Sequence, residues 1–228
     1  MTTKTNNQVY QFRINLKKIT PMIWRRFLIQ DDRTFADLHY VTQIIMGWTN
    51  YHLNEFSIHG KRYTIANNIG MASPNGNFAE KIKLQDLRLK LNKKFLYAYD
   101  FTAGWEFEIR LEKSLPNNEK KTYPTCISGS GASPDEECGG PERFEFLKTA
   151  WFLKAYEELG EFLKTLESKL ENSDEEPINN VFYINRLREV NYWLNIDKYK
   201  RKQVNKYLKL YAKNDDRWQE AFDEVLYL

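Results

Sequence analysis

Cysteine is scarce in this sequence of 228 residues, which contains only Cys126 and Cys138. Two cysteines cannot form the disulfide framework of small secreted domains, so an ordinary hydrophobic core must hold the fold. Long apolar runs are missing as well: none approaches the ~20 residues of a membrane span, and residues 1–8 lack the apolar stretch of a signal peptide. We therefore expect a cytoplasmic protein without a membrane partner.

No sign of charge predominates, because 34 Lys and Arg residues are set against 31 Asp and Glu residues, for a net charge of +3. This balance argues neither for nor against a polyanionic partner until the distribution of the charges is considered. The signatures of a phosphate-binding loop, a serine-hydrolase elbow and a zincin helix are absent. We predict no cofactor, and a binding protein is favoured over an enzyme.

Apolar material for a core is plentiful, at 42% hydrophobic and 15% aromatic residues. Alternating apolar positions predict strands, and apolar positions three and four apart predict a helix. Thr34 and Asp37 resemble a capping box before that helix, and Gly47 is a suitable end. The N-terminal body should therefore be α+β, with a hairpin, helix and strand in an order like that of the β-grasp fold: strands at 10–16 and 23–29, a helix at 35–45, and strands near 55–59 and 62–65.

A second hairpin is predicted after a polar loop at residues 66–82, because apolar side chains alternate over 95–99 and 105–111. Residues 114–141 are rich in Gly and Pro and are predicted to form a long loop. A loop of that length in a compact domain is usually functional or disordered, and its cysteines and Tyr123 favour function.

Helical spacing prevails after the long loop, which divides the chain into an α+β body at 1–141 and a helical part at 142–228 packed on it. The expected elements of the helical part are one long amphipathic helix at 144–170, an acidic linker near 171–177, and helices at 179–194, 197–213 and 215–227.

Trp24, Arg25 and Arg26 lie on the second predicted strand, where neighbouring side chains point to opposite faces. An arginine on a sheet face can hold a carboxylate or a phosphate with two hydrogen bonds. The alternative is a structural ion pair with the acids of the loop at 134–141.

His39 and His52, which lie near Trp48 in the sequence, could act as acid or base near neutral pH. His39 is on the edge of an apolar helix face, where a hydrogen-bonded core histidine is the alternative. Asp100, which ends a strand shortly before Trp105, could bind a metal or orient a histidine. It could equally accept N–H groups of the turn, and we favour this alternative.

Cys126, Glu136, Glu137 and Cys138 lie among the glycines of the long loop and could contribute to a metal site. Zinc usually takes four Cys or His ligands, so histidines would have to come from elsewhere, and no metal is predicted. The structural alternative is a rigid loop whose acids pair with Arg25 or Arg26. Redox chemistry at the two cysteines would need a lowered thiolate pKa.

The helix predicted at 197–213 carries a run of cations without an intervening acid. Steps of three and four place one set on a single face: Lys198, Lys202, Lys206, Lys209 and Lys213. Such a face could bind the phosphates of a nucleic acid, weakly and with a steep dependence on salt. The alternative is a solvated helix whose tyrosines pack inward and whose charge is neutralised by nearby acids.

Several ordered blocks carry a further signal: Tyr10–Ile14, Pro21–Arg26, Phe35–His39, Met46–Thr49, Tyr97–Phe101, Tyr123–Cys126 and Pro134–Pro141. Together they resemble the plasmid pRiA4b ORF-3-like family, found on bacterial and archaeal chromosomes, plasmids and transposable elements, some as TnpR-family passenger proteins. The resemblance implies an α+β fold and no particular activity. Thr102, Ala103 and Phe107 replace the Gly-Asp and the His that the family usually has, which weakens any site that depends on them.

We therefore expect a binding or adaptor protein, associated with mobile elements, that holds a protein or, weakly, a nucleic acid. Its groove would be formed by the hairpins and the loop at 123–141, with these residues: Trp24, Arg25, Arg26, His39, Trp48, His52, Asp100, Trp105, Glu136 and Glu137. The alternative function is a metal-dependent or acid/base enzyme whose site is built from His39, His52, Asp100, Glu136 and Glu137.

Overall fold

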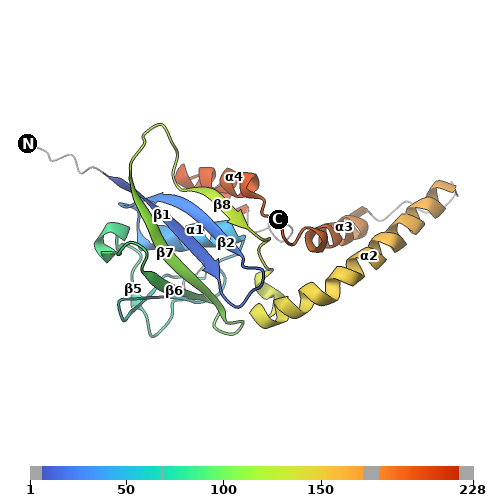
Figure 1. Ribbon diagram of the computed structural model, residues 1–228, viewed down its shortest axis with the longest axis horizontal. Coiled ribbons are helices and arrows are strands. Elements are labelled where there is room, and N and C mark those ends of the chain that lie inside the picture. The colour runs from blue at the N-terminus through green and yellow to red at the C-terminus, as the bar shows by residue number, and fades with distance from the viewer. Residues whose placement is uncertain (1–6, 68, 172–179, 221–228) are drawn as a thin grey trace, which may run out of the picture.

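The computed structural model describes residues 7–67, 69–171 and 180–220. Within these residues, eight strands form one sheet in the order β5-β4-β3-β6-β7-β1-β2-β8. Helix α1 lies across one face of the sheet, α4 lies beside β8, and α2 and α3 extend away from the sheet (Figure 1). The predicted α+β class is confirmed.

The N-terminal hairpin is formed by β1 (Gln8–Leu16) and β2 (Trp24–Gln30), close to the predicted bounds. β1 also pairs with β7 (Trp105–Pro116), which makes it a central strand. Phe12 and Ile14 point from β1 into the core, where they are almost fully buried. Because side chains alternate along a strand, the residues between them form a polar face on the other side of the sheet.

Helix α1 (Phe35–Met46) begins and ends where its capping residues predict. The Thr34 hydroxyl accepts the N–H of Asp37 at 3.1 Å, and the Asp37 carboxylate accepts the N–H of Thr34 at 2.7 Å. These bonds satisfy backbone donors that the first turn leaves free. Gly47 ends the helix with a φ of 69°, in the left-handed region that glycine adopts without strain.

Three of the strands on the far side of β7 follow the predicted order, and the short strand β5, which pairs with β4, falls within the residues 66–82 that were predicted to be a loop. Their bounds are β3 (Asn54–Ile58), β4 (Lys61–Thr64), β5 (Asn77–Phe78) and β6 (Lys94–Tyr99), with the 3₁₀ helix η1 (Leu84–Leu87) between the last two. β1 runs antiparallel to β7, whereas a β-grasp sheet has a parallel pair at its centre. The likeness to that fold therefore extends to the order of the elements alone.

The prediction of one long loop at residues 114–141 is wrong in its extent. β7 continues to Pro116, β8 (Thr125–Ser130) pairs with β2 at the edge of the sheet, and a 3₁₀ helix, η2 (Glu136–Cys138), follows. The open edge of β2 supplies the hydrogen bonds that make β8 a strand. Because β8 contains serine and glycine in place of an apolar alternation, its sequence has no strand pattern.

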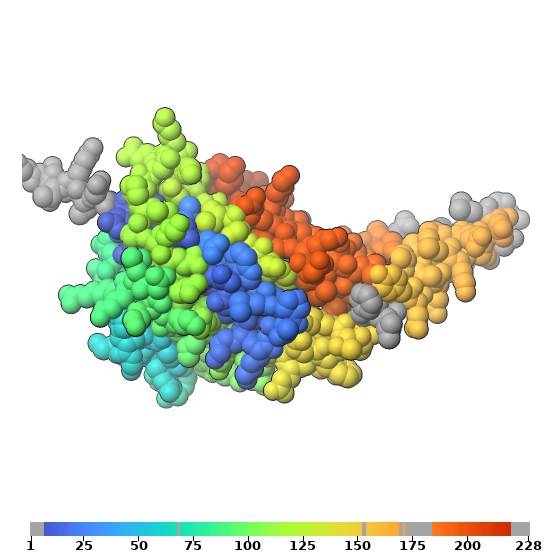
Figure 2. All heavy atoms as spheres, in the orientation of Figure 1, coloured from blue at the N-terminus to red at the C-terminus, as the bar shows by residue number. Residues whose placement is uncertain are grey.

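The helical part consists of α2 (Pro141–Glu171), α3 (Asn180–Leu194), α4 (Arg201–Ala212) and the 3₁₀ helix η3 (Asp216–Glu220). α2 extends away from the sheet with α3 along it (Figures 1 and 2), and the rings of Trp151 and Trp193 stack between them at 5.9 Å. Val204 and Leu208 of α4 belong to the same hydrophobic core as α1 and the sheet. α4 is therefore packed on the body.

The predicted bounds of the last two helices need correction, and part of the helical region lies outside the described residues. α4 begins at Arg201 and not at residue 197, and η3 is the described portion of the helix predicted at 215–227. The acidic linker after Glu171 and residues 221–227 lie outside the described residues. No helix in the described ranges combines the length and apolar character needed to cross a bilayer.

Candidate functional site

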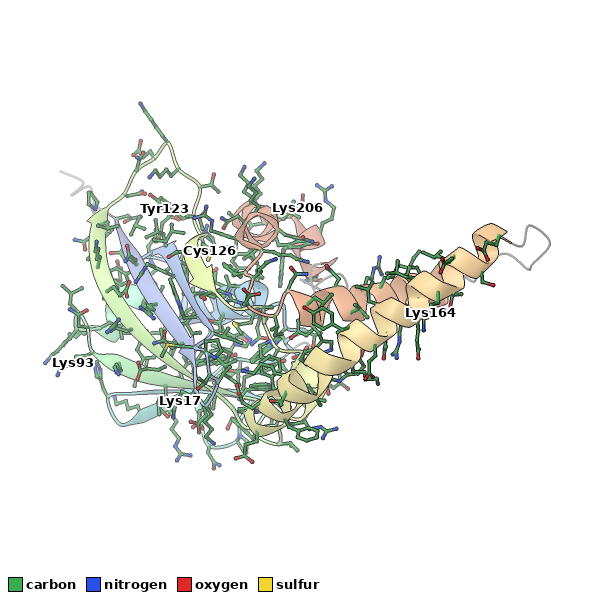
Figure 3. The ribbon with its side chains drawn as sticks, turned by 45° about the vertical axis from the view of Figure 1, so that its right-hand side comes forward. Lys17, Lys93, Tyr123, Cys126, Lys164 and Lys206 are labelled. Atoms are coloured by element: carbon green, nitrogen blue, oxygen red, sulfur yellow. The ribbon has the colours of Figure 1, made fainter. Side chains whose placement is uncertain are left out.

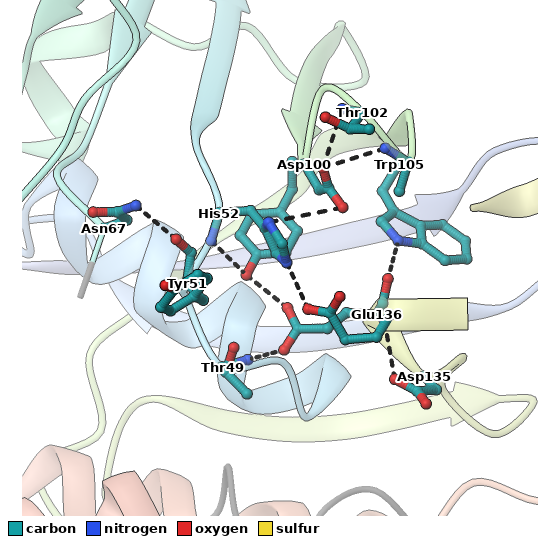
Figure 4. A network of polar contacts seen from close by, with 12 residues as sticks. Thr49, Tyr51, His52, Asn67, Asp100, Thr102, Trp105, Asp135 and Glu136 are labelled. Carbon is teal, nitrogen blue, oxygen red and sulfur yellow. Dashed lines mark hydrogen bonds and ion pairs between the residues drawn. The ribbon is translucent and has the colours of Figure 1, made fainter. Parts of the chain in front are cut away.

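The segment at 134–141 meets the end of α1 and the β6–β7 turn in a network of polar contacts (Figure 4). The Glu136 carboxylate is central to it, because it accepts the Tyr99 hydroxyl and the Thr49 N–H, each at 2.7 Å. The Glu136 backbone carbonyl accepts the indole N–H of Trp105 at 3.0 Å. Glu136 is only 4% exposed. A buried, hydrogen-bonded carboxylate of this kind links segments of the fold.

Two further contacts fasten the same segment to the core. The indole N–H of Trp48 donates to the carbonyl of Pro134 at 2.9 Å, and the Trp48 ring stacks on Tyr99 at 5.2 Å. Gly140 has a φ of 93°, and a Cβ on it would lie 2.0 Å from the carbonyl oxygen of Ala103. This close approach requires glycine. Gly140 therefore allows the segment at 134–141 to pack against the β6–β7 turn.

His52 lies at the edge of this network, between two carboxylates. Its Nε2 is 2.7 Å from a Glu137 oxygen and its Nδ1 is 3.8 Å from an Asp100 oxygen. Asp100 also accepts the N–H groups of Thr102 and Ala103 at 3.1 and 3.2 Å, which are the turn contacts favoured from the sequence. The structure thus brings together four of the five residues of the enzyme alternative: His52, Asp100, Glu136 and Glu137.

The fifth residue, His39, is fully buried and lies apart from them. Its Nδ1 is 2.8 Å from the Tyr97 hydroxyl, which itself accepts the Gln43 amide, and its Nε2 is 2.8 Å from the Asn50 carbonyl oxygen. These partners suit a neutral imidazole with its proton on Nε2. Burial lowers the pKa of His39 to about 4, so the ring is neutral near pH 7. His39 is the hydrogen-bonded core residue of the alternative prediction.

Metal binding at these residues finds no support in the described ranges, which contain no group of three His, Cys, Asp or Glu side chains able to hold a metal ion. The predicted open groove is not supported at this place either. Arg25, His39, Trp48 and Trp105 are at most 1% exposed. Their side chains make internal contacts and do not line a surface.

The alternative in which the arginines of β2 pair with acids of the 134–141 loop is not what the described contacts show. Arg26 lies on the polar face of the sheet and pairs with Glu112 of β7 through two bonds, at 2.6 and 3.1 Å. Burial raises the pKa of Glu112, but hydrogen bonds from Arg26 and Gln11 outweigh it and lower that pKa to about 2. Trp24 lies beside Arg26 on this face, with the guanidinium 5.2 Å from its ring.

Arg25 points the other way, into the core, where it is fully buried. Among the described ion pairs none includes Arg25. Its guanidinium donates instead to the carbonyls of Ile45, Trp24 and Ser130 and to the hydroxyl of Ser133, at 2.8 to 3.2 Å. Burial lowers its pKa from the usual value. Arg25 therefore joins α1, β2, β8 and the loop after β8.

The two cysteines are free thiols. Cys126 is buried, and its sulfur lies 3.1 Å from the Tyr199 hydroxyl that donates to it. Burial raises the pKa of both thiols, that of Cys138 to about 11. A redox or nucleophilic role needs the opposite shift, so the described geometry favours structural roles for both.

A different surface feature is a groove of about 870 Å³ between α4 and the loop that joins β7 to β8. Figure 3 shows these two walls, with Lys206 on α4 and Tyr123 at the base of the loop. Six lysines and no carboxylate occur among its described lining residues: Lys120, Lys121, Lys202, Lys206, Lys209 and Lys213. We call this feature the lysine groove.

The structure brings four of the five predicted lysines into the lysine groove but not Lys198. That residue precedes α4 and bonds to the Asn195 side chain at 2.7 Å. Sequence reasoning missed Lys120 and Lys121, because a loop has no periodicity that places its side chains. The one sequence feature that could have pointed to them is that the two lysines are adjacent in a polar loop.

The α4 wall of the lysine groove is held in place by contacts on its inner side. The Asn205 side chain exchanges two bonds with the backbone of Cys126 on β8, at 2.7 and 2.8 Å. The Tyr211 hydroxyl donates to Asp37 of α1 at 2.6 Å. Val204 and Leu208, on the side of the helix away from the lysines, are buried beneath. The lysines of α4 are thereby presented on a fixed surface.

Nearby acids are placed outside the lysine groove. Asp215 pairs with Arg217, which lowers the pKa of Asp215 to about 2. Glu119 does not line the lysine groove but a neighbouring hollow, which Lys120 and Lys121 also line. Lys213, at the end of the stripe, also contributes to lowering the pKa of Asp215, whereas no ion pair is described for Lys202, Lys206 or Lys209. The acidic linker after Glu171, Asp223 and Glu224 lie outside the described residues.

Comparison with known proteins supports the resemblance found in the sequence. The model of the plasmid pRiA4b ORF-3-like family matches residues 8–179. The uncharacterised protein y4hQ of Sinorhizobium fredii is 29% identical over 166 residues, which are 68% of this chain and 79% of that protein. The crystal structure of the protein of unknown function MM3350 from Methanosarcina mazei is 30% identical, with a TM-score of 0.58, and the match covers 87% of this chain and 98% of that one. Neither name assigns an activity.

Proposed function

The chain belongs to the plasmid pRiA4b ORF-3-like family, and we propose that it is a nucleic-acid-binding protein that uses the lysine groove. One observation carries the proposal: lysines from two segments distant in sequence line one groove whose described lining has no carboxylate. Like charges held close together repel, and a polyanion relieves that repulsion while releasing its own counterions. The plasmid origin in the family's description is in keeping with a partner handled by a mobile element.

The buried network around Glu136 favours a structural role over catalysis at that place. Its carboxylate is occupied by Tyr99 and Thr49, and burial raises the pKa of Tyr99, which keeps its hydroxyl protonated as a donor. Groups that satisfy one another in this way hold the fold together and are not free to accept a substrate.

Binding of a fluorescent oligonucleotide of about 20 residues, single-stranded or duplex, tests the proposal by anisotropy. At about 50 mM salt we expect the full chain to bind at least one of them with a Kd of roughly 10⁻⁶ M, and about 200 mM salt should abolish most of the binding. The variant Lys202→Glu/Lys206→Glu/Lys209→Glu should lose about tenfold or more in affinity, because three phosphate contacts become repulsive.

A matched control is available on the opposite part of the sheet. Lys61→Glu/Lys90→Glu/Lys93→Glu changes the net charge equally, at three exposed positions outside the lysine groove. It should retain affinity within about threefold of wild type. Equal losses in both variants would assign the binding to net charge alone. Absence of binding by the wild type at low salt would overturn the proposed function.

A further inference from the structure

The lysine groove has two cationic walls that face each other. One is α4, with Lys202, Lys206 and Lys209, and the other is the β7–β8 loop, with Lys120 and Lys121. Figure 3 shows the loop standing beside α4, on the same side of the sheet. A ligand lying in the groove therefore meets positive charge from both sides.

Between the walls, the floor of the lysine groove is apolar. Leu28, Pro124, Ile127 and Leu210 contribute to it. Two of the three uncharged polar residues in the described lining are already engaged, because the Asn205 side chain bonds to the backbone of Cys126 and the Thr125 hydroxyl bonds to Asn205. The third, Thr122, is exposed. The floor thus offers apolar contact and few free groups that could read a base edge or a 2′-hydroxyl.

A duplex does not match these two features together. Its phosphates face outward, and its base faces are hidden in the stack, so it could contact one wall but not the floor. A single strand exposes both its phosphates and the faces of its bases. From Lys202 to Lys213 the chain advances by roughly 17 Å along the helix axis, which at the ~3.4 Å per nucleotide of a stacked strand corresponds to a site of up to about five nucleotides.

We propose that the lysine groove binds single-stranded nucleic acid over about five nucleotides, with phosphates on the two lysine walls and base faces on the apolar floor. This inference rests on the proposed function and adds the class of nucleic acid. We expect recognition to depend little on sequence or on the sugar, because Thr125 and Asn205 are engaged within the protein and Thr122 is the one other uncharged polar residue in the described lining.

The test compares labelled single-stranded DNA, single-stranded RNA and duplex DNA of about ten residues each, titrated with the full chain between about 50 and 200 mM salt. We expect both single strands to bind at least about tenfold more tightly than the duplex and to agree with each other within about threefold. Four to six phosphate contacts predict a slope of log K against log salt of roughly −3 to −4 for the single strands.

Two variants separate the walls from the floor. Lys120→Glu/Lys121→Glu should weaken single-strand binding by about fivefold or more and make the salt slope shallower by about 1.4, because each lost phosphate contact contributes about 0.7. Ile127→Ser should weaken binding by about threefold with the slope unchanged, because it removes apolar contact and no charge. Lys90→Glu/Lys93→Glu is the matched two-charge control, and a urea midpoint for each variant excludes unfolding.

The outcomes distinguish the two proposals. If duplex binds as tightly as single strands and Lys120→Glu/Lys121→Glu has no effect, the nucleic-acid function stands and the single-strand inference is overturned. If only one of DNA and RNA binds, independence of the sugar is wrong. If none of the three probes binds at about 50 mM salt, both proposals fail together.

Discussion

The guanidinium of Arg25 lies over the ring of Tyr199, 3.8 Å from its centroid. This contact connects β2, near the start of the chain, to the segment that leads into α4. A cation over an aromatic face is favourable and gains strength away from water. Gly129 of β8 makes room for the arrangement, since a Cβ there would lie 2.6 Å from the Tyr199 ring. The position of the α4 wall therefore depends on a residue of the N-terminal hairpin.

Arg25→Lys should lower the free energy of unfolding by about 3 kcal/mol, because lysine keeps a buried charge but cannot serve four acceptors in a planar fork. The midpoint of urea denaturation measures this. Arg62→Lys is the control, because the Arg62 side chain is 60% exposed, and its effect should stay below about 0.5 kcal/mol. A loss below about 1 kcal/mol for Arg25→Lys would contradict the structural role.

Glu136 and Glu137 are neighbours with opposite expected effects. Glu136→Gln replaces one acceptor oxygen by an NH₂ group that faces a donor, either the Tyr99 hydroxyl or the Thr49 N–H. We expect a loss of about 1–3 kcal/mol. Glu137→Gln should cost less than about 0.5 kcal/mol, since that side chain is 66% exposed. Thermal or urea unfolding of the two variants measures these losses in the free energy of unfolding. Equal losses would refute the assignment of Glu136 as the central link.

His39 should make stability depend on pH. Its pKa is lowered from 6.5 to about 4 in the folded state, so between these values the unfolded chain binds more protons. Stability is therefore complete above pH 6.5 and falls as the pH drops toward 4, by about 3 kcal/mol in total.

The test is the pH dependence of unfolding for wild type and His39→Gln, with His59→Gln at an exposed turn as control. The fall between pH 6.5 and 4 should be reduced in His39→Gln alone. The contribution of Glu112 to the pH dependence is separable, because the pKa of Glu112 is lowered from 4.5 to about 2. The stabilisation that Glu112 provides is lost only as the pH falls from about 4.5 toward 2. An unchanged slope in His39→Gln would show that His39 is not the titrating group.

Both cysteines should react slowly with a thiol reagent in the native protein. The pKa of Cys138 is raised to about 11, which reduces its thiolate at pH 8 by about 100-fold relative to an ordinary thiol, and Cys126 is additionally buried. The rate of reaction with a chromogenic disulfide, measured before and after addition of urea, compares the native thiols with the same thiols in the unfolded chain. Rapid native modification of either residue would reopen the redox hypothesis.

Local sequence patterns predicted the elements whose stabilising contacts are near in the chain. The capping box of Thr34 and Asp37 and the left-handed Gly47 are contacts within a few residues, so they defined α1 almost to the residue. Alternation over β1 and β7 likewise defined the strands, because the period of two reports which face is buried. The α4 lysines were placed on one face by helical geometry alone.

Contacts between distant segments were decided only by the tertiary structure. β8 is a strand because the open edge of β2 lies beside it, which no property of residues 125–130 reveals. Arg25 and Arg26 are adjacent and chemically identical, yet the pleat sends one into a core lined with carbonyls and the other to Glu112. Lys120 and Lys121 complete the lysine groove because the loop that carries them stands beside a helix about 80 residues further along the chain. A sequence pattern has the period of one element, whereas a site made of two elements depends on how the chain packs.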